Sequence, residues 1–295
     1  MAISCYLSVK QFVLIFLFSF LATLQEGEAL LEPINVNNKR AYYDIMRGTI
    51  LTGTSVFLSY TPSLQKATAA DVTSIRAKEF PDAASFYQKY QYKAPKDILL
   101  YINDCDIKDG NAKGVIDALE IFSLYYPMYK LSTAKATILT NEIKKSQPKN
   151  ILEIGTFFGY SALNMGSVMP IGSSLTCIEA NRDNADVARI ILDKGLGPNS
   201  KVRGSVRIID GISSKVLDDK SNPLGNAPYD FVFLDHDKDC YLTDLKTLES
   251  KGMLASNCVI VADNVVFPGA PGYLEYVSGV GKFSVEGKTE AESGR

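Results

Sequence analysis

The chain of 295 residues contains no tryptophan, a single histidine, and five cysteines of which no two form a C-x-x-C pair. Structural zinc sites are built from clustered cysteine and histidine ligands, so this composition argues against one. The cysteines are scattered, which also argues against a disulfide framework: Cys5, Cys105, Cys177, Cys240 and Cys258. Cys177 and Cys258 lie in apolar, strand-like runs, and we expect both to be small buried hydrophobic residues.

An excess of positive charge is also absent, because 31 lysines and arginines are outweighed by 33 acidic residues. No basic run with interleaved aromatic residues occurs, so nucleic acid is not an expected partner. The sequence shows neither an internal repeat nor a low-complexity segment. With 46% hydrophobic residues, it predicts a globular protein with a sizeable core, and we expect a monomer.

The N-terminus carries the clearest targeting signal. Phe12–Leu24 is an apolar run, shorter than the roughly 20 residues that a transmembrane helix needs. Gly27 and Ala29 are small residues at the spacing that signal peptidase prefers, so residues 1–29 are predicted to be a cleaved secretory signal. A retained membrane anchor is the alternative. The protein is therefore expected in the secretory pathway, in the ER lumen or secreted, or attached to a membrane.

Residues 30–93 form an N-terminal extension to which the sequence assigns no role. From residue 94 to 295, helical patterns over 96–103, 112–123 and 133–145 precede short apolar runs that alternate with further helical segments. Five runs are continuous and bounded by polar or glycine residues, as buried parallel strands are: 150–154, 174–178, 206–209, 231–234 and 258–262. This alternation predicts an α/β fold with a doubly wound, Rossmann-like parallel sheet and flanking helices.

The first of these runs leads into a glycine turn and then a helix. The turn contains Gly155 and Gly159, which let the backbone approach a ligand, and the free N–H groups of the helix suit a carboxylate. The spacing E-x-G-x-x-x-G differs from the dinucleotide fingerprint G-x-G-x-x-G, so NAD is disfavoured. Taken alone, the turn is equally compatible with a structural role.

A carboxylate follows at the end of the second predicted strand. Glu179 stands where open α/β sheets reach the ribose of a bound nucleoside, and a carboxylate can accept both ribose hydroxyls. A solvated carboxylate at a strand end is the alternative.

Oxygen-bearing side chains follow the fourth and fifth predicted strands. Asp235 comes directly after one, and Asp263 and Asn264 after the other. Carboxyl ends of parallel strands meet at the same edge of a sheet, so we expect these residues to converge. Hard oxygen ligands of this kind suit Mg²⁺ and leave room for water and two substrate oxygens.

Four motifs together resemble the catechol O-methyltransferase family of class I S-adenosylmethionine-dependent enzymes: LEIGTFFGYSA, IEAN, FVFLDHDKDCY and VADNVVFPGAP. The resemblance extends from about residue 94 to 283, and the last two motifs are its most specific part. It implies Mg²⁺-dependent transfer of a methyl group from S-adenosylmethionine to a hydroxyl of a catechol-like small molecule.

The resemblance also implies roles for individual residues. Lys238 would be the catalytic general base, and Mg²⁺ would be held by Asp235, Asp263 and Asn264. The implied cofactor contacts are Met128, Glu153, Gly155, Gly159, Tyr160, Ser161, Glu179, Ser213, Ser214, Asp235 and His236. Among them, Ser161 would bind the methionine carboxylate, and Ser213, Ser214 and His236 would surround the adenine.

The sequence departs from the family in two places. Tyr126 and Asp237 stand where the family has tryptophans, at the substrate gate and beside the adenine. After Phe283 the sequence becomes polar, so the closing antiparallel strand of the family is expected to be missing. These differences leave two alternatives open: an O-methyltransferase for another vicinal diol, and a catalytically inactive relative that acts as a binding or assembly protein.

Overall fold

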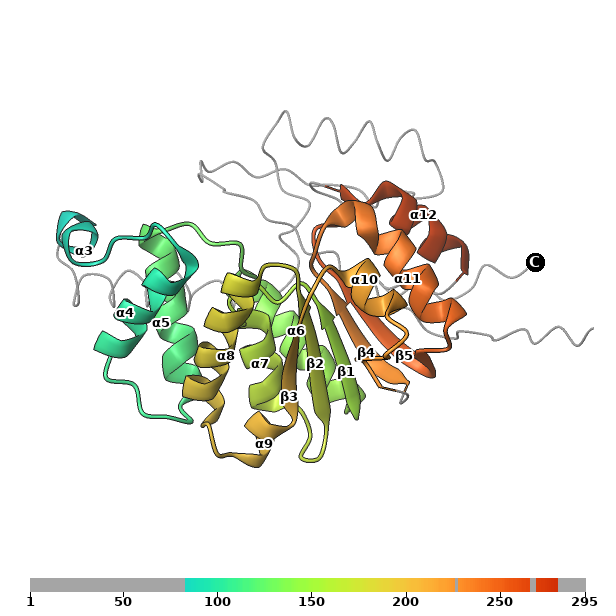
Figure 1. The fold of residues 1–295 in the computed structure, drawn as a ribbon, viewed down its shortest axis with the longest axis horizontal. Helices are drawn as coiled ribbons and strands as arrows, with labels where there is room; N and C mark the ends of the chain where they lie inside the picture. Colours follow the sequence, from blue (N-terminus) through green and yellow to red (C-terminus); the bar gives the residue numbers. More distant parts are fainter. Residues whose placement is uncertain (1–82, 226–227, 266–268, 281–295) are drawn as a thin grey trace, which may run out of the picture.

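A parallel sheet of five strands forms the centre of the molecule (Figure 1). The computed structural model describes residues 83–225, 228–265 and 269–280. The strand order is β3-β2-β1-β4-β5. The strands are β1 (Asn150–Ile154), β2 (Ser174–Glu179), β3 (Val206–Asp210), β4 (Tyr229–Leu234) and β5 (Leu254–Ala262). All four neighbouring pairs are parallel, so the predicted doubly wound sheet is confirmed.

Two strands begin earlier than their apolar runs predicted. β5 starts at Leu254 rather than Cys258, and it includes the exposed Ser256 and Asn257. β5 lies at the edge of the sheet, where polar side chains still reach solvent, so apolar character alone underestimated its length. β4 starts at Tyr229, two residues before the predicted run, and the register between β4 and β5 shifts there.

Helices cover both faces of the sheet. In Figure 1, α7 and α8 lie on one side of the strands, and α10, α11 and α12 lie on the other. The hydrophobic cluster on the side of α7 and α8 includes residues of the sheet and of seven helices: α3 (Ala83–Lys89), α4 (Ile98–Asp104), α5 (Ala112–Tyr125), α6 (Thr133–Ser146), α7 (Tyr160–Val168), α8 (Arg182–Leu196) and α9 (Lys201–Gly204). A second cluster joins the other face to α10 (Ser213–Asp218), α11 (Tyr241–Ser250) and α12 (Pro271–Val280).

Alternation along β4 explains why its sequence is continuously apolar. Phe231 and Phe233 belong to the first hydrophobic cluster, whereas Val232 and Leu234 belong to the second. Successive strand residues point to opposite faces, so a strand with helices on both sides buries every side chain. Cys177 on β2 and Cys258 on β5 are likewise fully buried, as the sequence predicted.

The three predicted helices before the sheet are confirmed with shifted ends. The first is divided into a 3-10 turn, η1 (Pro95–Asp97), and α4, and the other two are α5 and α6. Asn111 caps α5 by accepting the N–H of Gly114, and Ser132 caps α6 by accepting the N–H of Lys135. A further helix, α3, precedes these three.

Residues 1–82 and 281–295 lie outside the described part of the chain. The signal peptide or anchor, the role of the extension and the missing closing strand therefore stay predictions. Within the ranges that are described, no helix combines the length and apolar character needed to cross a membrane.

An N-terminal aromatic cluster joins α3 and α4 to α5. It consists of Phe86, Tyr90, Tyr101, Phe122 and Tyr125, all of them buried. The rings of Phe86 and Tyr125 are stacked, with centroids 3.8 Å apart and planes inclined by 7°. Phe86 is the centre of the cluster because it contacts each of the other four rings.

Replacing Phe86 with alanine should therefore lower the free energy of unfolding by about 3–5 kcal/mol, because a fully buried ring is lost and a cavity is left. Urea denaturation of the two proteins measures the difference. Leu100→Ala is the control, since Leu100 is 60% exposed and should cost little. Equal losses in the two variants would show that the aromatic cluster does not hold α3 in place.

Candidate active site

The candidate site lies where the order of the strands reverses, between β1 and β4. At such a switch point the connections leave in opposite directions and open a crevice beyond the carboxyl ends of the strands. Two backbone hydrogen bonds extend the strand pairing past β4: the N–H of Asp235 donates to Ile154 O (2.9 Å), and that of Asp263 donates to Leu234 O (2.9 Å). Gly155, Asp235 and Asp263 are consequently neighbours at one edge of the sheet.

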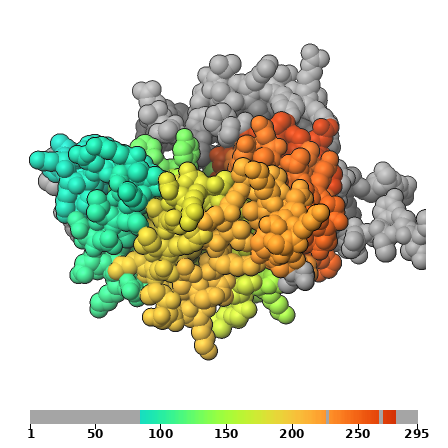
Figure 2. Space-filling model, viewed as in Figure 1, coloured from blue at the N-terminus to red at the C-terminus, as the bar shows by residue number. Residues whose placement is uncertain are grey.

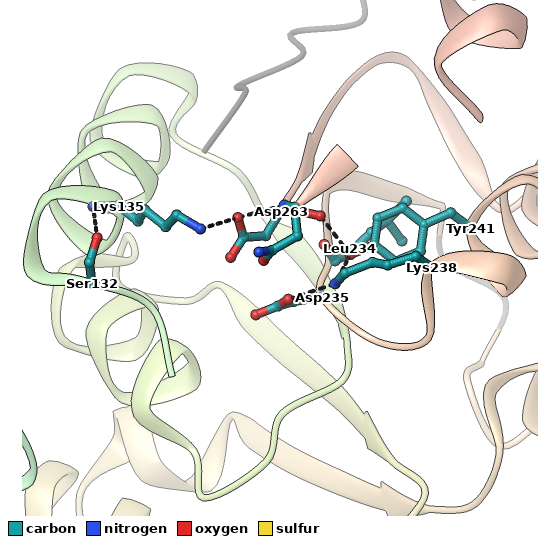
Figure 3. A network of polar contacts seen from close by, with 8 residues as sticks. Ser132, Lys135, Leu234, Asp235, Lys238, Tyr241 and Asp263 are labelled. Atoms are coloured by element: carbon teal, nitrogen blue, oxygen red, sulfur yellow. Dashed lines mark hydrogen bonds and ion pairs between the residues drawn. The ribbon is translucent and has the colours of Figure 1, made fainter. Parts of the chain in front are cut away.

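Asp235 and Asp263 are each paired with a lysine (Figure 3). Oδ1 of Asp235 lies 3.0 Å from Lys238 Nζ, and Oδ1 of Asp263 lies 2.7 Å from Lys135 Nζ. Burial raises the pKa of Asp235 to about 7; the charge of Asp263 raises it too, while Lys238 and Lys135 oppose the shift. The charge of Asp263 thus acts on Asp235, so the two side chains lie near each other at this edge of the sheet.

Oxygen atoms suited to a hard cation are available here. Within the described residues, neither Asp235 Oδ2 nor Asp263 Oδ2 accepts a hydrogen bond, and Asn264 directly follows Asp263. No group of three or more histidine, cysteine, aspartate or glutamate side chains suited to a metal is found in that part of the chain. The predicted ligand set consists of two carboxylates and one amide, so it contains only two residues of those four types. Oxygen donors of this kind fit Mg²⁺.

Tyr241 connects the parts of this site, and this role was not predicted from the sequence. Its hydroxyl accepts a hydrogen bond from Lys238 Nζ (2.7 Å) and lies 2.8 Å from Leu234 O and 3.0 Å from Asp263 O. It therefore joins the ends of β4 and β5 and holds the lysine beside Asp235. Burial, followed by the charges of Asp235 and Asp263, raises the pKa of Tyr241 far above its usual range. The final tyrosine of the motif FVFLDHDKDCY was the available signal.

Lys135 was also missed, and here the sequence contained no signal. It lies in the first turn of α6, and 128 positions separate it from Asp263. Only the packing of α6 against the sheet edge brings the two side chains together.

Glycine is required at the end of β1 by two separate constraints. Gly155 has φ of +89°, and a Cβ at this position would stand 2.5 Å from the backbone oxygen of Asp235. Gly159 has φ of +79°, and its Cβ would meet the Cβ of Ala188 at 3.2 Å. The turn thus combines a left-handed backbone with close approach to β4 and α8, which explains both glycines of the motif without invoking a ligand.

Glu153 is fully buried at the carboxyl end of β1. Its carboxylate accepts hydrogen bonds from the hydroxyls of Ser161 and Thr156. Burial raises the pKa of Glu153 to about 6, and the two hydroxyls counter part of the shift. The Ser161 hydroxyl is therefore engaged with Glu153, and the backbone N–H groups at the start of α7 are left as the donors for an anionic ligand group.

Glu179 is connected to the same turn. Its Oε2 accepts the N–H groups of Thr156 (3.1 Å) and Phe157 (2.8 Å), and its Oε1 accepts the N–H of Asn181 (3.0 Å). The side chain is nearly buried rather than solvated, so the alternative of a solvent-exposed carboxylate is wrong.

The loop that carries Met128 is fixed to the turn through Tyr160. The hydroxyl of Tyr160 donates to Glu120 on α5, and Lys130 Nζ lies 2.8 Å from Glu120 Oε2 and 4.7 Å from the centroid of the Tyr160 ring. Met128 itself is partly buried against the first hydrophobic cluster. The structure thus places the loop beside the glycine turn. Within the described part, no contact links Met128 to Asp235 or Asp263.

The predicted adenine contacts occupy two places on the carboxyl edge. Ser213, which is buried, and Ser214, which is exposed, begin α10. His236 lies after β4, where its Nε2 is 2.9 Å from Asp244 Oδ2 and its ring stacks on Tyr241. Its Nδ1 is buried and has no hydrogen-bond partner in the described structure. The serines and His236 lie at the same edge of the sheet, and within the described residues no hydrogen bond joins them.

Tyr126 and Asp237, which the resemblance matches to tryptophans of the family, both make local contacts. The Tyr126 hydroxyl donates to Tyr90 O (2.8 Å), and its ring packs beside the N-terminal aromatic cluster. Asp237 accepts the N–H of Asp239 and caps the short 3-10 helix η2 (Lys238–Cys240). Neither side chain reproduces the large apolar surface of a tryptophan.

Gly155→Ala should be much more destabilising than Gly172→Ala. Both glycines have φ close to +90°, but a Cβ on Gly172 meets nothing within 4 Å. Gly172→Ala should cost about 1–3 kcal/mol of backbone strain, and Gly155→Ala about 1–3 kcal/mol more because of overpacking against β4. Urea denaturation of both variants tests this, and equal losses would contradict the proposed steric constraint.

Glu153→Gln should change how stability depends on pH. The folded-state pKa of Glu153 is about 6, above the ordinary value of 4.5, so its stabilising contribution is complete below pH 4.5 and is lost as pH rises through 6. Relative to the glutamine variant, the wild type should lose about 2 kcal/mol of unfolding free energy over this interval. Denaturation at pH 4.5 and 7.5 measures the difference, and a difference that is independent of pH would refute the assignment.

Comparison with known proteins identifies the family of this chain. The model of the O-methyltransferase family matches residues 116–272, more than half of the chain. Catechol O-methyltransferase B of Danio rerio is 34% identical over 169 residues, which cover 57% of this chain and 62% of that protein. The Transmembrane O-methyltransferase of Macaca mulatta is 32% identical over 154 residues, covering 52% of this chain and 50% of that protein.

Among solved structures, an O-methyltransferase from Bacillus cereus in complex with SAH has a TM-score of 0.49 and 23% identity, over 61% of this chain and 84% of that chain. The chain spans 62% of the length of the Danio rerio relative and half of the Macaca mulatta relative. The family match covers the glycine turn, Lys135 and both carboxylates of the site. This chain belongs to the O-methyltransferase family and is similar to the catechol O-methyltransferases.

Proposed function

We propose that this protein transfers a methyl group from S-adenosylmethionine to one hydroxyl of a catechol-like diol, with Mg²⁺ as the metal ion. The observation that carries the proposal is the pair Asp235 and Asp263 at adjacent strand ends, with Lys238 beside them and the glycine turn next to them. Membership of the O-methyltransferase family supports the reaction type. The names of the similar proteins support the substrate class.

Asp235, Asp263 and Asn264 would hold the cation through oxygen atoms. When bound, Mg²⁺ would orient the two hydroxyls of the diol and lower the pKa of the one that is methylated. The two aspartates suit this task because each has one oxygen that is not engaged by the described residues. Tyr241 keeps the ends of β4 and β5 together, so the separation of the two carboxylates is fixed in advance.

Lys238 would take the proton of the attacking hydroxyl. Its Nζ is held by Asp235 and by the Tyr241 hydroxyl, so the amine has a fixed position next to the proposed diol site. The lysine accepts a proton in its neutral form only. Its side chain is 18% exposed, which leaves a path for the proton to return to solvent.

The other half of the crevice would hold the methyl donor. Glu179 would accept the ribose hydroxyls, and the N-terminal N–H groups of α7 would bind the methionine carboxylate near Ser161. Met128 would lie beside the sulfonium, held there by the contacts of Lys130 with Glu120 and Tyr160. S-adenosylmethionine supplies an electrophilic methyl group, so catalysis by this chain would consist mainly of positioning and electrostatics.

The position of Tyr126 favours a second candidate within the same reaction type. Its hydroxyl is bound to Tyr90 O, and its ring lies against Phe122 rather than forming a free gate. A site that lacks the family's tryptophan gate is compatible with another vicinal diol, such as a phenylpropanoid. A panel of diols offered with labelled S-adenosylmethionine would distinguish the candidates through their kcat/KM values.

Methyl transfer to catechol should require both the metal and the lysine. We expect a chelator to abolish turnover, and Lys238→Met to lower kcat by about 100-fold or more, which is the contribution typical of a general base. Lys220→Met is the matched control, because Lys220 is exposed on the connection between α10 and β4. The rate is measured with labelled donor at saturating catechol and Mg²⁺.

Two results would contradict the proposal in different ways. Full turnover after chelation would remove the metal from the mechanism but leave the methyltransferase intact. Tight binding of S-adenosylmethionine without methylation of any diol in the presence of Mg²⁺ would instead favour a binding or assembly protein.

A further inference from the structure

Lys135 forms the most deeply buried ion pair among the described residues. Its side chain and that of Asp263 are each 4% exposed, and Nζ lies 2.7 Å from Oδ1 (Figure 3). Removing two charges from water is costly, and such a pair often stabilises a fold no better than apolar residues would. A buried pair at the proposed cation site therefore calls for a role besides stability.

Orientation of Asp263 does not depend on Lys135 alone. The same oxygen, Oδ1, also accepts the backbone N–H of Asn264 at 2.7 Å. This second donor belongs to the adjacent residue, so it would keep the carboxylate in place if the lysine were neutral. The contribution that is unique to Lys135 is therefore its positive charge.

The four ionic side chains of the site balance one another. In their ionised forms, Asp235 and Asp263 carry two negative charges, and Lys238 and Lys135 carry two positive charges. A divalent cation that approaches the carboxylates is attracted by their negative charges and repelled by the positive charges of the two lysines that are paired with them. Screening by water is weak in a buried site, so each charge has a large effect on affinity.

We propose that Lys135 acts through Asp263 as a charge-balancing residue, which limits the affinity of the Asp235–Asp263 pair for a divalent cation. The cation is then held firmly only when an anionic oxygen of the substrate adds negative charge. This inference rests on the proposed function, since it concerns the same metal site.

The test is a titration of the full-length chain with Mn²⁺, with free Mn²⁺ followed by electron paramagnetic resonance and unfolding followed by thermal melting. Lys135→Gln removes the charge but keeps an N–H donor for Asp263. Lys135→Arg keeps the charge. Lys130→Met is the matched control, because it breaks a partly buried ion pair with Glu120, in which the lysine side chain is 8% exposed. Within the described residues, no hydrogen bond or ion pair joins Lys130 to Asp235 or Asp263.

Lys135→Gln should bind Mn²⁺ at least about tenfold more tightly than the wild type, because one nearby positive charge is gone. The Lys135→Arg and Lys130→Met variants should stay close to the wild-type dissociation constant. Added catechol should tighten Mn²⁺ binding more in the wild type than in Lys135→Gln. The melting temperature of Lys135→Gln should be lower without Mn²⁺ and should rise more when it is added, since tighter binding to the folded state stabilises more.

Unchanged or weaker Mn²⁺ binding by Lys135→Gln, with normal binding by the wild type, would overturn this inference and leave the proposed function standing. Absence of Mn²⁺ binding by every protein, wild type included, would overturn the metal site and the inference together. If Lys135→Gln is unfolded without the ion, recovery of the fold at Mn²⁺ concentrations below the wild-type dissociation constant supports the proposal, and no recovery contradicts it.

Discussion

The pairing of β4 with its two neighbours is the constraint on which the site depends. The ladder continues one residue beyond β4 on both sides, through the N–H of Asp235 to Ile154 O and the N–H of Asp263 to Leu234 O. These bonds place three consecutive strand ends in register, so two carboxylates and a glycine turn become neighbours without any flexible loop. The rigidity of the site is therefore that of the sheet itself.

The close approach of β1 and β4 also limits which residues can follow β1. The backbone oxygen of Asp235 occupies the space in which a Cβ of Gly155 would lie, and the left-handed φ excludes most other residues independently. Gly155 thus has a structural reason that is separate from cofactor binding. The steric constraint and the proposed cofactor contact fall on the same residue, because the crevice of an open α/β sheet lies beyond the adjacent ends of these two strands.

Buried charge is concentrated around this crevice. Glu153 and Glu179 are held by hydroxyl and backbone N–H donors at the glycine turn, whereas Asp235 and Asp263 are held by lysines. The two kinds of partner have different consequences. Neutral donors satisfy a carboxylate without cancelling its charge, as suits Glu179 if it accepts ribose hydroxyls, whereas ammonium groups cancel the charge and so set how strongly a cation is attracted.

The sequence alone determined the strands, the glycine turn and the acidic strand ends, because each depends on residues that are close together in the chain. Continuous apolar runs mark strands that are buried on both faces. Because the strands of a parallel sheet run in the same direction, their carboxyl ends lie at one edge. Membership of the O-methyltransferase family followed from motifs of the same local kind. The length of the edge strand β5 was underestimated because Ser256 and Asn257 interrupt its apolar sequence.

Only the tertiary structure decided which groups contact these local elements. The pairing of Lys135 with Asp263 spans 128 positions, and the position of Tyr126 depends on the packing of α3 against α5. Such contacts depend on how a helix docks on the sheet, and a helical pattern specifies which of its faces is buried but not which distant side chain it meets. The charge balance of the site was therefore invisible in the sequence, although every residue that contributes to it was printed there.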